Sequence, residues 1–220
     1  NNLSIIHEGK RDRERLSFSM KSLSSADLIY ADYFETNLFF QDSSQKTRNF
    51  QHRNDNNLKR QRDISFGTTL MGIESSLKKM FDSEDFSHDI QIGLEMSSSD
   101  VESNYLLTDF LQDGRILDDN RNSMAPSEAF ELGFYILDEI TFGEEQDWIL
   151  SPSLRFDFYE VKPDSNDVFL ANSANVGFTP VHYKNKVLGT PGVSLIHRFN
   201  NEINYYFSYN HGIRNPTAEE

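Results

Sequence analysis

Apolar and polar side chains alternate along several stretches of the chain, most clearly in AFELGFYILDEITFG, residues 129–143. The even-numbered positions form one parity, which is apolar except for Asp138. Its apolar members are Phe130, Leu132, Phe134, Ile136, Ile140 and Phe142. Successive side chains of a β-strand point to opposite faces, so this stretch predicts a strand with one apolar and one polar face. The same alternation predicts about eight strands, near residues 11–20, 28–40, 64–80, 88–97, 128–142, 148–160, 191–199 and 202–211.

In the other predicted strands, the apolar parity is set by fewer residues. In residues 148–160 it holds Leu154, Phe156 and Phe158, and in residues 88–97 it holds Ile90, Ile92, Leu94 and Met96. In residues 64–80 we assign it to Ile64, Phe66 and Leu70. The closing strand carries Ile203, Tyr205, Phe207 and Tyr209 on one parity. An all-β antiparallel sheet is therefore the predicted fold class.

The connections between the predicted strands alternate in length. Residues 21–27, 81–87, 143–147 and 200–201 make short connections, whereas residues 41–63, 98–127 and 161–190 make long polar ones. Such alternation puts all long loops on one side of the sheet, as in outer-membrane β-barrels with short periplasmic turns and long external loops. Trp148 and Tyr159 lie near opposite ends of one strand, where the aromatic girdles of such barrels are expected.

Composition narrows the choice of partner and of chemistry. The 35 Asp and Glu against 21 Lys and Arg give a net charge of −14, which repels phosphate backbones, so nucleic acid is not expected as a partner. The 6 His fall in different segments with no two at metal-ligand spacing, and neither a nucleophile elbow nor a phosphate-binding glycine loop is present. We therefore expect neither an enzyme nor a metal site.

Three stretches give the chain its resemblance to a known family. They are ELGFYILDEITFG, LSPSLRFDFYEVKP and YYFSYNHGIRNPTAEE, which occur in this order between Glu131 and Glu220. They resemble strands and an arginine-proline box of the TonB-dependent outer-membrane receptors, and within these the haem/haemoglobin (transferrin, lactoferrin) receptor branch.

The resemblance implies a transmembrane, up-and-down antiparallel β-barrel in the bacterial outer membrane. Residues 1–220 would be one segment of a larger barrel, with about eight of its strands and without the N-terminal plug domain. The implied activity is uptake of haem or another iron-bearing ligand, carried as cargo and not as a covalent cofactor. The implied partners are the TonB energy-transducing complex, acting through the plug, a haem-carrying protein or iron chelate at the external loops, and the lipid bilayer.

The resemblance also implies two groups of site residues. The arginine-proline box at a strand tip would contact ligand, and it consists of His211, Gly212, Ile213, Arg214, Asn215 and Pro216. Two of its members depart from the family, because Ile213 and Asn215 stand where the family has Phe and Ala. The polar parity of the strands would face the plug-filled lumen: Glu131, Glu139, Arg155, Asp157, Asn204 and Asn210.

Two other interpretations fit the alternation. A self-contained eight-stranded outer-membrane barrel with an adhesive or structural role would need both termini on the side of the short turns. A soluble, secreted β-sandwich that binds through its long loops would pack the apolar faces against a second layer of the same chain.

Overall fold

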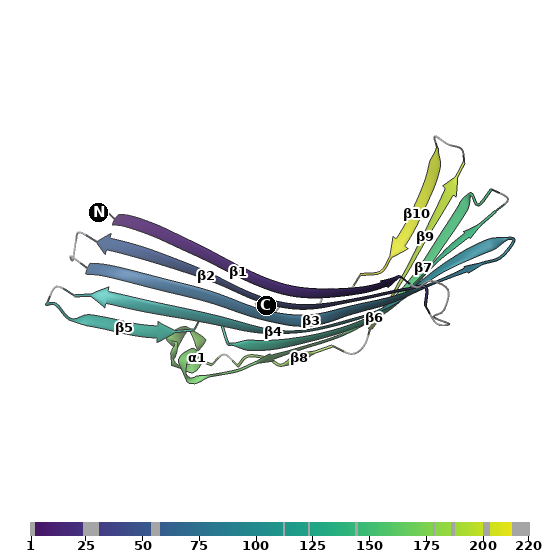
Figure 1. Cartoon of the computed structure of the whole chain (residues 1–220). Helices are drawn as coiled ribbons and strands as arrows, with labels where there is room; N and C mark the ends of the chain where they lie inside the picture. The colour runs from purple at the N-terminus through teal and green to yellow at the C-terminus, as the bar shows by residue number, and fades with distance from the viewer. Residues whose placement is uncertain are drawn as a thin grey trace.

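The computed structural model describes residues 3–23, 31–53, 58–111, 113–122, 124–143, 145–177, 179–185, 188–199 and 203–212. These residues form one antiparallel sheet with two short helices (Figure 1), with the elements β1 (Leu3–Leu23), β2 (Tyr33–Arg53), β3 (Leu58–Asp82), β4 (Phe86–Phe110), β5 (Ile116–Arg121), β6 (Ser127–Phe142), β7 (Trp148–Pro163), α1 (Asp167–Ala171), η1 (Ser173–Asn175), β8 (Tyr183–Lys184), β9 (Leu188–Arg198) and β10 (Asn204–Asn210). None of the helices in these ranges is long and apolar enough to cross a membrane.

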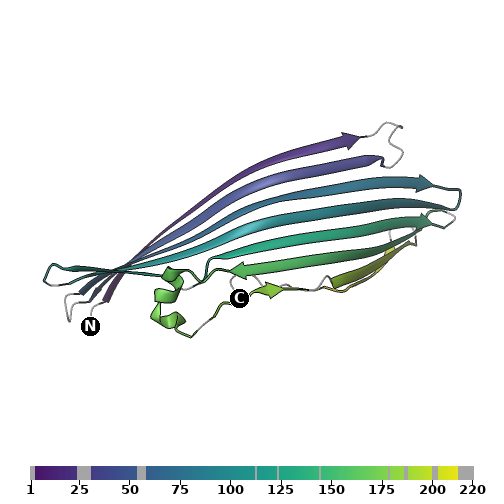
Figure 2. The ribbon, with the colours of Figure 1, turned by 90° about the horizontal axis from the view of Figure 1, so that it is seen from below.

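The eight main strands lie side by side in the order in which they occur in the chain, β1-β2-β3-β4-β6-β7-β9-β10, while β5 pairs with β4 and β8 with β7. This order confirms the predicted antiparallel, up-and-down sheet of about eight strands. Figure 2 shows the sheet as a single curved layer, so the second layer that a β-sandwich needs is absent from the described residues. Within the described residues β1 and β10 are the edge strands, because each pairs with only one neighbouring strand. The sheet is therefore not closed into a barrel.

The strands are much longer than predicted. β1 and β2 have 21 residues each, and β3 and β4 have 25 each, which at about 3.3 Å per residue is about 70–85 Å. The predicted long loop at 41–63 is mostly the paired outer halves of β2 and β3, where Gln41 lies opposite Leu70 and Arg53 opposite Leu58. Most of the predicted loop at 98–127 is likewise β4 and β5. Both predictions were wrong because neither stretch has one consistently apolar face, whereas the ladder of backbone hydrogen bonds needs none.

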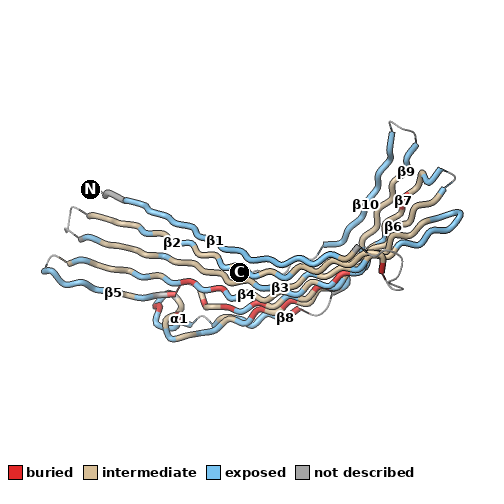
Figure 3. Tube along the Cα trace, in the orientation of Figure 1, coloured by how far each residue is buried: buried red, intermediate tan, exposed pale blue. Residues whose placement is uncertain are grey.

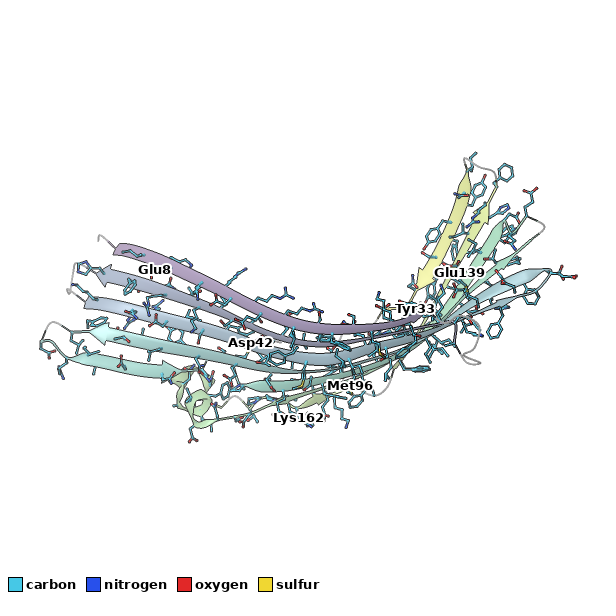
Figure 4. The ribbon with its side chains drawn as sticks, in the orientation of Figure 1. Glu8, Tyr33, Asp42, Met96, Glu139 and Lys162 are labelled. Atoms are coloured by element: carbon cyan, nitrogen blue, oxygen red, sulfur yellow. The ribbon has the colours of Figure 1, made fainter. Side chains whose placement is uncertain are left out.

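The strand pairing places most of the predicted apolar residues on one face, because directly paired residues of an antiparallel sheet share a face. Figure 4 shows side chains on both faces along the strands. One row of directly opposite residues across the apolar face runs through six strands: Phe18, Leu38, Ile73, Met96, Leu132 and Phe158. Several of its members are exposed to solvent, among them Phe18 and Leu38. We call this the apolar face, and the opposite side of the sheet the polar face.

The parity assigned to β3 was wrong. Met71, Ile73 and Leu77 share the apolar face with β4, whereas Ile64, Phe66 and Leu70 lie on the polar face. β3 carries apolar side chains of both parities, so alternation within the strand does not decide its orientation. The pairing of Ile73 with Met96 does.

The apolar segment shifts along the strands from one edge of the sheet to the other. In β1 it centres on Phe18, which shares a row with Leu132 of β6, whereas in β10 it centres on Phe207, which shares a row with Ile140 of β6. Eight residues of about 3.3 Å make a shift of about 26 Å over seven strand spacings of about 4.8 Å, which corresponds to a tilt of about 38°. Transmembrane barrels tilt their strands by about 35–45°, so the apolar segments form one level band around a tilted sheet.

The third predicted long loop, residues 161–190, contains α1, η1 and β8. Phe169 of α1 is only 1% exposed, and the side-chain amides of Asn172 and Asn175 donate to the backbone oxygen of Asn122. Buried residues gather where β4, β6 and β7 run near α1 (Figure 3), including the polar-face cluster of Ala129, Tyr159 and Val161. This segment therefore contributes a small core at one end of the sheet.

Candidate functional site

A cluster of charged side chains lies on the polar face where β4, β6 and β7 are adjacent. Arg155 Nη2 lies 2.7 Å from Glu95 Oε2, and Arg155 Nε lies 2.7 Å from Asp157 Oδ1. One guanidinium therefore bridges carboxylates on two strands that are separated by β6. These residues line a groove of about 470 Å³ together with Glu74 and Glu131. Four carboxylates against one guanidinium make the groove acidic.

Glycine at position 133 makes room for this cluster. A Cβ atom on Gly133 would lie 2.6 Å from Arg155 Nη2 and 3.2 Å from Asp157 Oδ1. The guanidinium therefore lies over the bare backbone of β6 between its two carboxylate partners.

We expect Gly133→Val to destabilise the protein by about 1–3 kcal/mol, because the added side chain overpacks the site and displaces the guanidinium from both carboxylates. The measurement is the thermal midpoint of the full-length receptor that contains this chain. The matched control is Gly67→Val in β3, where an added Cβ meets no atom within 4 Å. Equal effects of the two substitutions would contradict the expectation.

The structure brings together three of the residues predicted to face a lumen. Glu131, Arg155 and Asp157 line the groove. Glu139 lies on the same face of β6 but pairs with Asp89 outside the groove. Asn204 and Asn210 lie on the polar parity of β10, opposite Arg198 and Gly192 of β9.

The predicted ligand-binding box is only partly described. His211 and Gly212 follow β10 directly, and the backbone N–H of His211 donates to the carbonyl of Pro191. Ile213, Arg214, Asn215 and Pro216 lie outside the described residues.

Sequence reasoning did not single out Glu95 and Glu74 as site residues. Glu95 shares its parity with Gly93 on the polar side of β4, but only the strand register shows that Arg155 reaches it from two strands away. It also did not identify the outer halves of β2, β3 and β4 as paired strands. A bidentate ion pair stabilises that region, because Arg60 of β3 donates two hydrogen bonds to Asp109 of β4, which lowers the pKa of the Asp109 carboxyl.

Aromatic rings line the apolar face at the end of the sheet that carries the short turns. Trp148 stacks on His197 at 3.9 Å between ring centroids and lies beside Phe142, while His197 is also stacked with Tyr205. This row has the composition of an interfacial aromatic girdle. Tyr159, expected at the other girdle, has the opposite parity to Trp148 and is buried on the polar face. Residues an odd number of positions apart point to opposite faces of a strand, so Trp148 and Tyr159 do not share a face.

One hydrogen-bonded polar pair interrupts the apolar face. Asp138 Oδ2 lies 2.8 Å from His88 Nδ1, and both residues have the parity of the apolar face. Asp138 lies between Ile136 and Ile140 in the apolar parity of β6. Within the described ranges, no group of three or more His, Cys, Asp or Glu side chains is arranged to hold a metal ion.

A family model agrees with this architecture. The model described as TonB dependent receptor-like, beta-barrel matches residues 4–220. None of the curated proteins gives a significant match to the chain.

Solved structures with a similar fold include three receptors or transporters. The siderophore receptor PiuA from Acinetobacter baumannii has a TM-score of 0.62 at 14% identity, over 92% of this chain and 32% of that one. The unliganded ferric citrate transporter FecA has 0.54 at 14% identity, over 91% and 27%. BauA, the ferric preacinetobactin receptor from Acinetobacter baumannii, has 0.51 at 12% identity, over 93% and 30%. The likeness shows a shared fold, and the chain spans less than a third of the length of each of these structures.

Proposed function

Because the chain belongs to the TonB-dependent receptor-like β-barrel family, we propose that it forms part of the wall of an outer-membrane receptor that imports an iron-bearing ligand. The family membership does not depend on any single motif, because the match extends over residues 4–220. The observation that carries the proposal is the apolar face that extends across the eight main strands, whose level follows a strand tilt typical of transmembrane barrels.

In this proposal the apolar face contacts lipid and the polar face lines the lumen. Glu131, Arg155 and Asp157 would then lie against a plug domain in the centre of the barrel, with Glu139, Asn204 and Asn210 on the same wall. An ion-paired, acidic groove suits contact with a basic surface, because unpaired charges facing an occupied lumen would be costly. Energy for import would come from the inner membrane through TonB and the plug.

The external side would be the one that carries the long strand extensions and α1. The box at residues 211–216, which begins directly after β10, would then contact ligand on this side. An iron chelate is the cargo we favour, since the structural neighbours described above include a siderophore receptor and a ferric citrate transporter. The alternative cargo is haem, delivered by a haem-carrying protein, for which His211 would be a ligand contact.

Uptake of radioactive iron by cells tests this proposal. A strain that lacks the full-length receptor gene is compared with the complemented strain, with ferric citrate, a ferric trihydroxamate, a ferric tris-catecholate and haem as iron sources. We expect the receptor to be required for uptake of at least one source, and a protonophore to abolish that uptake. Receptor-dependent uptake that persists without the proton gradient would contradict TonB-driven import, and the absence of receptor-dependent uptake from every source would contradict the function itself.

A further inference from the structure

Three arginines alternate along the outer half of β1, in the stretch KRDRER, residues 10–15. Arg11, Arg13 and Arg15 pair with Gln45, Ser43 and Gln41 of β2, all on the polar face. The residues between them, Asp12 and Glu14, lie on the opposite face. The alternation of charge in the sequence is therefore separated into a basic side and a largely acidic side of the same strand.

The polar face around these arginines has few carboxylates to neutralise them. In the outer halves of β1 to β4, as far as the structure describes them, it carries five arginines and one acidic residue: Arg11, Arg13, Arg15, Arg60, Arg62 and Asp109. Asp109 is engaged by Arg60. Asp119 of β5 lies on this face at its far edge, with three strands between β5 and β1. A chain with a net charge of −14 thus concentrates positive charge on one surface.

The contacts of these arginines leave guanidinium N–H groups for a ligand. Arg13 Nη2 donates to the amide oxygen of Gln41 at 2.5 Å, and the Arg15 guanidinium lies 5.5 Å from the centre of the Phe39 ring. Both are neutral partners, so neither contact cancels the charge. The Nε atom of Arg62 is buried without a hydrogen-bond partner. β1 is exposed along this stretch.

This surface has the chemistry of an anion-binding site. Guanidinium groups bind carboxylates in a bidentate fashion, and concentrated positive charge raises the rate at which anions associate. Side chains of Gln41, Ser43 and Gln45 on the neighbouring strand offer hydrogen bonds to polar groups of the same ligand. The acidic groove around Arg155, further along the polar face, would repel an anion. The ligand would therefore be held beside the arginine row.

We propose that the polar face of the β1–β3 extension, formed by the paired residues 3–15, 41–53 and 58–70, captures anionic, carboxylate-bearing iron chelates before they enter the lumen. The inference rests on the proposed import function and adds the charge class of its cargo. Recognition depends on Arg11, Arg13 and Arg15 together, because they form a row along one exposed strand.

The test compares two triple variants of the full-length receptor that remove the same charge from opposite faces. Arg11→Gln/Arg13→Gln/Arg15→Gln removes the arginine row, and Lys10→Gln/Lys46→Gln/Arg48→Gln removes three cations from the other side of the same strands. The probes are iron-labelled ferric citrate, which is anionic, and a cationic ferric trihydroxamate. Heat-modifiable mobility of the receptor in isolated outer membranes shows that each variant is folded.

We expect the arginine variant to bind ferric citrate at least about tenfold more weakly, and the control variant to stay within about twofold of wild type. Three results would overturn the proposal: equal losses in the two variants, unchanged ferric citrate binding in the arginine variant, or wild-type binding of the cationic chelate alone. Wild-type binding of only the cationic chelate leaves the import function intact. If the wild type neither binds either chelate nor imports iron from any source, both the anion-capture proposal and the import function are wrong.

Discussion

Lysine in place of Phe134 should destabilise the receptor by about 2–4 kcal/mol, the cost of a cation on the lipid face of a barrel near the bilayer midplane. Phe134 lies in the middle of the apolar parity of β6, between Leu94 of β4 and Phe156 of β7. The measurement is the urea concentration at which the full-length receptor unfolds in lipid vesicles.

Leu137→Lys is the matched control for this substitution. Leu137 lies three residues further along β6, on the polar face opposite Gln91 and Ser153. Both substitutions replace a large apolar side chain by lysine, so they differ mainly in the face that receives the charge. We expect the polar-face variant to lose less than about 1 kcal/mol, since lumen substitutions escape the lipid cost. The reverse order of the two variants would mean that the faces are assigned wrongly.

His88→Leu should cost about 2–3 kcal/mol, because it leaves the Asp138 carboxylate on the apolar face without its partner. The two side chains are only 28% and 22% exposed, so water does little to replace the lost contact. The same urea titration measures the loss.

The double variant His88→Leu/Asp138→Leu should recover that loss and reach or exceed wild-type stability. Replacing both members of a poorly solvated polar pair with apolar residues removes the desolvation cost of each. A double-mutant cycle with both single variants gives the coupling energy of the pair. If His88→Leu is neutral, or if the double variant is less stable than either single variant, the pair does not lie against lipid.

The alternation in the sequence located the central part of the sheet well. β6 and β7 were predicted at 128–142 and 148–160 and occupy Ser127–Phe142 and Trp148–Pro163. These strands are apolar on one parity over most of their length, so periodicity alone defines both the element and its faces. The short turns between strands followed from the same pattern.

The extensions, the orientation of β3 and the charged groove needed the pairing of strands. Ser43 to Lys46 of β2 carry no apolar residue, yet each is paired with β3. Leu70 and Met71 are adjacent and face opposite sides, and only the register with β4 decides which side is apolar. Arg155 reaches Glu95 across β6, a contact between residues 60 positions apart in the sequence. Periodicity describes one strand at a time, whereas these features depend on its neighbours.

Spin labels along β6 test the membrane-facing assignment most directly. The chain contains no cysteine, so a single cysteine introduced at Glu131, Leu132, Phe134, Tyr135, Ile136 or Leu137 is the only labelling site in these 220 residues. In lipid vesicles that contain the full-length receptor, we expect labels at 132, 134 and 136 to collide mainly with dissolved oxygen. Labels at 131, 135 and 137 should be more accessible to a water-soluble nickel chelate than their neighbours. Accessibility without a two-residue period, or with the opposite phase, would contradict the account.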